Sequence, residues 1–337
     1  MNLFGENEVL RKISDLGDPL EKLDTVIDWE IFRPTLTELL SKEPKGKGGR
    51  PHWDYVLMFK ILILQRLYNL SDDQTEKNIL DRLSFRSFLH LDLFNAKIPD
   101  AKTIWQFKNE LSKINGGNTL FELFEKSLEQ AGMIKHEGTI VDASFVEVPR
   151  QRNKRDENKK IKDGEVPDQW SEQKKRQKDT DARWTKKGNQ QYFGYKNSTA
   201  VDQRTKLIKT FEVIPASTHD SQSFESVLSE KDRVVYADSA YVGQKIKYPV
   251  KVNTIDRAYR NKPLSKKQRK RNYKLSKTRC RIEHVFGFIE NSMGGSTFRG
   301  VGLVRATFNV AITNLVYNLC RFEQILRISN RKLAECA

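Results

Sequence analysis

Apolar residues recur at helical spacing along the start of the chain, which predicts an all-α domain over residues 1–132. Residues 53–68 are apolar on nearly every side of a helix, a pattern typical of the buried centre of a bundle. Residues 31–40 form a shorter amphipathic candidate. The Gly-, Pro- and Lys-rich stretch 42–51 is expected to be a linker between these two helices.

Polar residues at the ends of these segments indicate where helices begin and stop. Ser71 and Gln74 form a capping-box pattern, which is expected to start a helix. The glycine pair 116–117 is expected to end a helix over 101–114, and Asn118 to cap the helix that follows. Two short helices with a turn between them also fit a helix-turn-helix, although any small bundle gives that signal.

The pattern changes near residue 138, where β-type runs appear among helices. The expected strands cover 139–146, 192–201, 207–214, 234–238 and 248–253. Expected helices over 276–289 and 304–328 complete an α/β layered domain over 133–337. Residues 150–190 are basic, rich in Gln and without clear periodicity, so we interpret them as an insertion or a mobile loop.

Charge indicates a polyanionic partner. The 337 residues contain 60 Lys or Arg and 44 Asp or Glu, a net charge of +16. Residues 257–281 hold twelve of the bases and no acid, and such a run is either a solvated face or a contact for nucleic-acid phosphates. The expected DNA-binding residues are Lys266, Lys267, Arg269, Lys270, Arg271, Lys277, Arg279 and Arg281. Trp184 also lies in a basic stretch, and either stacks on a base or belongs to a small core.

Other features exclude several protein classes. No apolar run is long enough to cross a bilayer, and the first residues do not form a signal peptide. The three cysteines include no C-x-x-C pair, which argues against a disulfide framework or a thiolate zinc site. We therefore expect a cytoplasmic protein.

Three acids form the candidate catalytic and metal-binding set. Asp142 lies in an apolar strand, Asp238 ends another, and Glu283 follows Arg279 by one helical turn. Singly, the aspartates fit turn or capping residues, and Glu283 fits a surface partner of Arg279. Together, two strands and a packed helix would bring three hard oxygen donors to one edge of the layer. Such a set suits two Mg²⁺ or Mn²⁺ ions acting on a phosphodiester.

These pieces resemble the DDE transposases of bacterial insertion sequences, in particular the insertion-sequence-five family. In the first half, the resemblance rests on residues 49–51 (GRP), a helix with the sequence LMFKILILQRLYNLSDDQ, DRLSFRSFL and PDAKTIWQFKNEL. In the second half, it rests on 139–144 (TIVDAS), 181–184 (DARW), 193–196 (FGYK), 219–221 (HDS), 237–241 (ADSAY), and Arg279 with Glu283. Two positions depart from the wider pattern Y-x-x-R-x-x-x-E-x-x-x-x-x-x-K, with Ser276 at the Tyr and Glu290 at the Lys.

The resemblance implies an RNase H-like catalytic domain, a mixed sheet with packed helices, after an all-α domain for DNA binding and dimerisation. It implies that Asp142, Asp238 and Glu283 hold two Mg²⁺ ions, with Mn²⁺ as an alternative. The partners would be double-stranded DNA, as terminal inverted repeats and as target, and a second copy of the chain. The protein would cleave the element ends and join the 3′-hydroxyls to target DNA. A nuclease without strand transfer and a non-catalytic DNA-binding protein remain alternatives.

Overall fold

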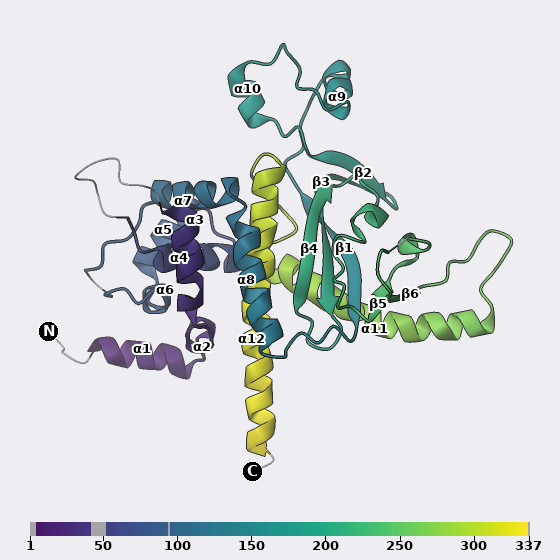
Figure 1. Cartoon of the computed structure of the whole chain (residues 1–337). Coiled ribbons are helices and arrows are strands. Elements are labelled where there is room, and N and C mark those ends of the chain that lie inside the picture. Colours follow the sequence, from purple (N-terminus) through teal and green to yellow (C-terminus); the bar gives the residue numbers. More distant parts are fainter. Residues whose placement is uncertain (1–4, 42–51, 94, 245, 336–337) are drawn as a thin grey trace. The chain divides into compact units, whose positions relative to one another are not determined.

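The computed structural model describes residues 5–41, 52–93, 95–244 and 246–335 (Figure 1). The chain forms two compact units. The helical unit comprises Met1–Leu123 with Ile312–Ala337, and the sheet unit comprises Phe124–Ala311. These units are defined by packing alone, so a functional division at residue 132 stays a prediction.

The helical unit is built around one buried helix. Its elements are α1 (Gly5–Asp15), α2 (Pro19–Val26), η1 (Trp29–Phe32), α3 (Arg33–Leu40), α4 (Tyr55–Leu67), α5 (Asp72–Asp81), α6 (Leu83–Phe88), α7 (Ala101–Lys113) and the start of α8 (Gly116–Gln130). Nine of the ten residues from Val56 to Gln65 in α4 are buried, all except Leu57, which confirms the bundle-centre prediction. The expected linker over 42–51 lies outside the described residues.

Capping explains most helix boundaries in this unit, and one expectation was wrong. The Ser71 hydroxyl accepts from the Gln74 N–H, and the Gln74 side chain accepts from the Ser71 N–H, which confirms the capping box. Helix α8, however, begins at Gly116 and not after Asn118. Asn115 adopts a left-handed backbone, with φ of 56°, and its carbonyl accepts from the Asn118 N–H. Because one residue makes the turn, the following glycines are free to enter the helix.

The sheet unit contains one mixed six-stranded sheet. Its strands are β1 (Thr139–Glu147), β2 (Arg183–Lys187), β3 (Gln190–Asp202), β4 (Ile208–Pro215), β5 (Val234–Ala237) and β6 (Lys251–Thr254). Strand β3 pairs antiparallel with β1, β2 and β4, while β5 pairs in parallel with both β1 and β6. The expected α/β architecture, with its β3–β4 strand pair, is therefore confirmed.

Two separate clusters of buried side chains form the core of this unit. One contains Val141 with Phe224 and Tyr241, and the other contains Val146 with Val310 of α12 (Leu303–Glu335). Side chains alternate along a strand, so Val141 and Val146, an odd number of residues apart, point to opposite faces. Both faces of the sheet are thus packed.

The basic segments are more ordered than the sequence indicated. Residues 150–190 contain α9 (Arg155–Lys162), α10 (Glu172–Gln177) and β2, so the segment is not irregular throughout, and its interpretation as an insertion or a mobile loop stays a prediction. Their helices are short and polar, with Trp170 as one of few buried side chains, which is why no periodicity was visible. At the base of the segment 150–190, the Lys178 ammonium donates to the Arg152 carbonyl at 3.0 Å and to the Asn153 side chain at 2.8 Å.

The second basic segment is a helix. Helix α11 (Lys266–Met293) begins ten residues before the expected start at 276. Ser265 and Gln268 form a capping box there, and Lys and Arg favour helix, so a charged run without apolar spacing still folds. In Figure 1 the first half of α11 extends away from the strands. Over the described ranges, no helix combines the length and the apolar character needed to span a membrane.

Candidate active site

Two acidic side chains come from neighbouring parallel strands. Ile140 of β1 lies beside Tyr236 of β5. Continuing the same register by two residues places Asp142 beside Asp238, because parallel strands advance together. Side chains alternate with a period of two and adjacent strands are about 4.8 Å apart, so both carboxylates lie on one face.

Arg279 of α11 connects these two carboxylates. Its Nη2 atom donates to Oδ2 of Asp142 at 2.9 Å, and its Nη1 atom lies 3.6 Å from Oδ1 of Asp238. Helix α11 is held against β1 and β5 by a buried stripe that includes Ile282 and Val285. The Arg279 side chain is only 17% exposed, and its Nε atom is buried without a hydrogen-bond partner among the described residues.

The electrostatics of the pair follow from this arrangement. Burial raises the pKa of Asp142 above its ordinary value, while the Arg279 guanidinium lowers it in part. The negative charge of Asp238 raises that pKa further. Backbone N–H groups of Ala143 and Ser239 donate to the two carboxylates at 2.9 and 2.6 Å. Two repelling carboxylates held together in this way favour a positive group between them.

The donor chemistry of this pair fits a hard divalent cation. Carboxylate oxygens are the preferred ligands of Mg²⁺ and Mn²⁺. A cationic group, the Arg279 guanidinium, already contacts both Asp142 and Asp238. The structure therefore brings together two of the three acids expected from the sequence.

The third acid, Glu283, is not joined to the other two. It is an exposed residue of α11, one turn beyond Arg279 on the same side of the helix. None of the hydrogen bonds or ion pairs in the described part of the chain involves its side chain, and no group of three His, Cys, Asp or Glu residues is arranged there to hold a metal. Glu290, at the position where Lys was expected, is also exposed. A three-acid metal site stays a prediction.

The basic first half of α11 presents its Lys and Arg side chains to solvent, while Gln268, Asn272 and Leu275 on another side are partly covered. The side chains of Lys266, Lys267, Arg269, Lys270, Arg271, Lys277 and Arg281 are exposed. Arg271 is anchored to Asp256 at 2.8 Å, and Arg281 donates to the Gln203 carbonyl at 2.7 Å. Arg279 differs from this group, because it is mostly covered and faces the acids.

Trp184 lies on strand β2 and is 45% exposed. Its ring is tilted against Phe193 at a centroid distance of 5.0 Å, and the Arg150 guanidinium lies 5.7 Å from the Trp184 centroid. The side chain is thus half packed and half accessible, and a cation lies beside it. Such a surface suits a nucleic-acid base, which stacks on aromatic rings and attracts cations.

Other motif residues have structural roles that sequence reasoning missed. Gly194 has φ of 150°, and a Cβ atom there would lie 2.2 Å from the Val146 carbonyl oxygen, so only glycine fits. Lys196 is buried and its ammonium donates to Asp220 at 2.7 Å. The Tyr195 hydroxyl donates to the Asp179 carboxylate at 2.7 Å. Polar residues inside otherwise β-type runs were the available signal for these contacts.

Asp179 also accepts hydrogen bonds at the start of α12. Its carboxylate accepts from the N–H groups of Ala182 and Gly302, both at 2.9 Å. Asp181 accepts from the Leu303 N–H at 2.8 Å. The end of the segment 150–190 is therefore tied to the first turn of α12, whose N–H groups would otherwise lack partners.

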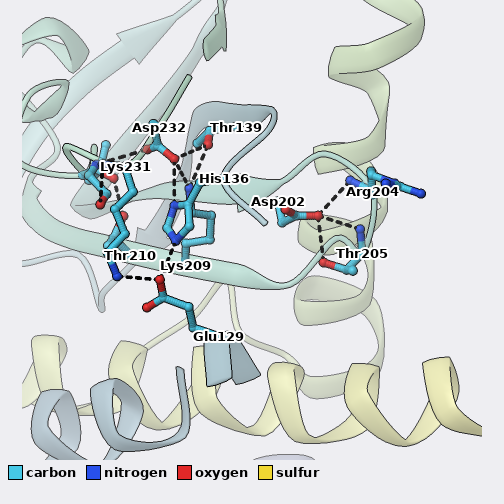
Figure 2. Close-up of polar contacts among 12 residues, drawn as sticks. Glu129, His136, Thr139, Asp202, Arg204, Thr205, Lys209, Thr210, Lys231 and Asp232 are labelled. Atoms are coloured by element: carbon cyan, nitrogen blue, oxygen red, sulfur yellow. Dashed lines mark hydrogen bonds and ion pairs between the residues drawn. The ribbon is translucent and has the colours of Figure 1, made fainter. Parts of the chain in front are cut away.

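A buried polar cluster joins the end of α8 to the sheet (Figure 2). Asp232 has a fully buried side chain and pairs with the Lys209 ammonium of β4. It also accepts from the Thr139 hydroxyl at 2.8 Å. His136 lies between Asp232 at 3.1 Å and Glu129 at 3.2 Å. Figure 2 also shows Asp202, whose carboxylate accepts from the backbone N–H groups that form the β3–β4 turn. We call Asp232, Lys209, Thr139, His136 and Glu129 the Asp232 cluster.

Comparisons with known proteins give two family matches and one similar structure. The family described as "Transposase DDE domain" matches residues 134–319, more than half of the chain. The family described as "Transposase domain (DUF772)" matches residues 8–110. A solved structure titled "Cryo-EM structure of piggyBac transposase synaptic complex with hairpin DNA" is similar over 95% of this chain and 81% of that chain, with 11% identity and a TM-score of 0.41.

Proposed function

Because the chain belongs to the Transposase DDE domain family, we propose that it moves one specific DNA element by metal-dependent phosphoryl transfer. In this proposal it recognises the inverted repeats at the element ends and cleaves there. It then joins the freed 3′-hydroxyls to target DNA. The resemblance of its motifs further supports membership of the insertion-sequence-five group, with action in the cytoplasm on nucleoid DNA.

The proposed catalytic residues are Asp142, Asp238 and Glu283. Asp142 and Asp238 would hold one or two Mg²⁺ or Mn²⁺ ions, with Glu283 as the third ligand. When bound, such ions supply activation of a water or a 3′-hydroxyl and neutralise charge on the leaving oxygen. The protein's own part is to keep the carboxylates adjacent, through parallel register, and ionised, through backbone N–H donors and Arg279.

The strand order of the sheet unit supports an RNase H-like catalytic domain. The run β4–β3–β1–β5–β6 has three antiparallel strands followed by two parallel to β1. Asp142 lies on the central strand and Asp238 at the end of its parallel neighbour. Helix α11 packs against both of these strands.

DNA binding is proposed for the basic half of α11 and for Trp184. Exposed Lys and Arg side chains around that helix would contact phosphates, and Trp184 with Arg150 would stack on a base. The helical unit would contribute recognition of the repeats. Bringing two DNA ends together requires at least a homodimer, which we also propose.

One observation carries the catalytic part of this proposal: two strand-borne carboxylates share a guanidinium on one face of the sheet. The test uses the full chain and a duplex oligonucleotide carrying the element end, with Mg²⁺. Asp142→Asn, Asp238→Asn and Glu283→Gln should each abolish cleavage and leave binding of the end largely intact. Glu290→Gln, an exposed acid on the same helix as Glu283, is the matched control and should cleave normally.

Strand joining is measured separately with pre-cleaved ends and a plasmid target. Joined products support transposition, whereas cleavage without joining indicates a nuclease instead. Normal cleavage by Asp142→Asn would refute the site. A Glu290 variant as inactive as the Glu283 variant would mean that the third ligand was wrongly chosen.

A further inference from the structure

We propose that Arg279 is an internal counter-cation of the Asp142–Asp238 pair, which competes with the divalent cation for the same two carboxylates. The inference rests on the proposed function, since it concerns the affinity of the proposed metal site. It gives Arg279 a task different from the phosphate contact expected from the sequence. It also separates Arg279 from the exposed bases around it.

The contacts of Arg279 are those of a group held between two acids. Nη2 is 2.9 Å from Asp142 and Nη1 is 3.6 Å from Asp238, so one delocalised charge serves both. The side chain is 17% exposed, against 30% for Asp142 and 48% for Asp238. The guanidinium is therefore the most covered member of the trio, which is unusual for an arginine in a basic run.

The position of Arg279 on α11 explains why this one base is turned inward. Ile282 and Val285 are the buried residues that press α11 onto the sheet. Arg279 lies three residues before Ile282, and therefore close to the packed stripe. Arg281 lies on another side of the helix and donates to the Gln203 carbonyl instead. The helix register thus selects Arg279 for contact with the acids.

The hydrogen bonding of the Arg279 guanidinium is incomplete, which suits a cation that another cation can replace. The Nε atom of Arg279 is buried and has no hydrogen-bond partner in the described part of the chain. A buried donor without a partner costs free energy, so the inward position is held mainly by the two carboxylates. A divalent cation that takes over both carboxylates would remove the reason for the guanidinium to stay there. Displacement would also leave Arg279 free to meet a DNA phosphate.

The test measures Mn²⁺ affinity of the DNA-free full chain by the electron paramagnetic resonance signal of unbound Mn²⁺. Arg279→Gln should bind Mn²⁺ about tenfold more tightly than wild type, because no charge-assisted hydrogen bond has to be broken first. Without metal, the same variant should unfold at a lower temperature, and saturating Mn²⁺ should raise that temperature more than in wild type.

Two further variants separate this effect from a general change in charge. Arg281→Gln removes one positive charge two residues away on the same helix and should change Mn²⁺ affinity little. Arg279→Lys keeps the charge but cannot reach both carboxylates with one planar fork, so its affinity should fall between wild type and Arg279→Gln. It also provides the measurement should Arg279→Gln fail to fold.

The inference is overturned if Arg279→Gln binds Mn²⁺ no more tightly than wild type, or if Arg281→Gln has an equal effect. Failure of the proposed function has a different result. If Asp142→Asn and Asp238→Asn bind Mn²⁺ as wild type does, these acids are not the metal site.

Discussion

Lys209→Met should destabilise the chain strongly, because it leaves a buried carboxylate without its cation. The Lys209 and Asp232 side chains are 1% and 0% exposed, so water cannot replace the lost partner. The remaining hydrogen-bond partners of Asp232 are the Thr139 hydroxyl at 2.8 Å, the Ser229 N–H at 3.0 Å and the His136 ring at 3.1 Å. Methionine has an unbranched side chain of a length similar to that of lysine but carries no charge, so the change removes the charge with little loss of packing.

The size of the effect follows from the burial of the pair. Removing one partner of a buried ion pair costs about 3–5 kcal/mol of unfolding free energy. For a unit of this size, 1 kcal/mol of unfolding free energy corresponds to about 2–4 °C in the thermal unfolding midpoint. That midpoint is therefore expected to fall by roughly 6–20 °C. The matched double variant, Lys209→Met with Asp232→Asn, removes both charges. It should recover a large part of the loss, because a neutral amide is less costly to bury than an unpaired carboxylate.

The assay is urea unfolding of wild type, both single variants and the double variant at pH 7.5, followed by circular dichroism. Asp232→Asn should also destabilise, because it leaves the Lys209 ammonium buried. Lys251→Met, at an exposed position of β6, controls for loss of one positive charge. The reasoning fails if Lys209→Met costs less than about 1 kcal/mol, or if the double variant is less stable than both single variants.

Three further predictions concern other residues of the sheet unit. Gly194→Ala should cost about 2–4 kcal/mol in urea unfolding, because the new Cβ meets the Val146 carbonyl; Gly188→Ala, with open space around it, should cost about 1 kcal/mol, and equal costs would contradict the clash. Burial and the nearby Glu129 raise the pKa of Glu125 to about 7, above its ordinary 4.5. Its folded-state pKa is the higher one, so stability is lost as pH rises through about 7, and Glu125→Gln should be relatively more stable at pH 8 than at pH 5; a difference independent of pH would refute this. Asp179→Asn should lower stability by about 2–3 kcal/mol, since an amide cannot accept from all four donors; Asp168→Asn, exposed, should change little, and a similar loss there would exclude the explanation.

Local signals allowed most elements to be predicted from the sequence. The capping box at Ser71 and the β-type runs of β3 and β4 are decided by neighbours in the chain, so short-range patterns suffice. The start of α11 had the same kind of signal in Ser265 and Gln268. There it was hidden, because this half of the helix consists largely of Lys and Arg and has no apolar period.

The candidate site was predictable in its residue types but not in its pairing. Asp142 and Asp238 were identified by their place in apolar strands, and parallel register then brings them together. Arg279 and Arg281 look alike within a basic run. Only the packing of Ile282 onto the sheet decides which of them faces the acids. Lys209 was missed for a similar reason, because its partner Asp232 comes from a distant part of the sequence.

The two ends of the segment 154–177 are held together, and this bears on how far the length of that segment can change. Lys178 joins the two ends through Arg152 and Asn153, and Asp179 then fixes the chain to Gly302. Residues 154–177 therefore leave the sheet unit and return to it at the same place. Halving or doubling such a segment changes the closure entropy by only about 0.6 kcal/mol. A different number of residues between 154 and 177 should therefore leave the register of the sheet that carries Asp142 unchanged.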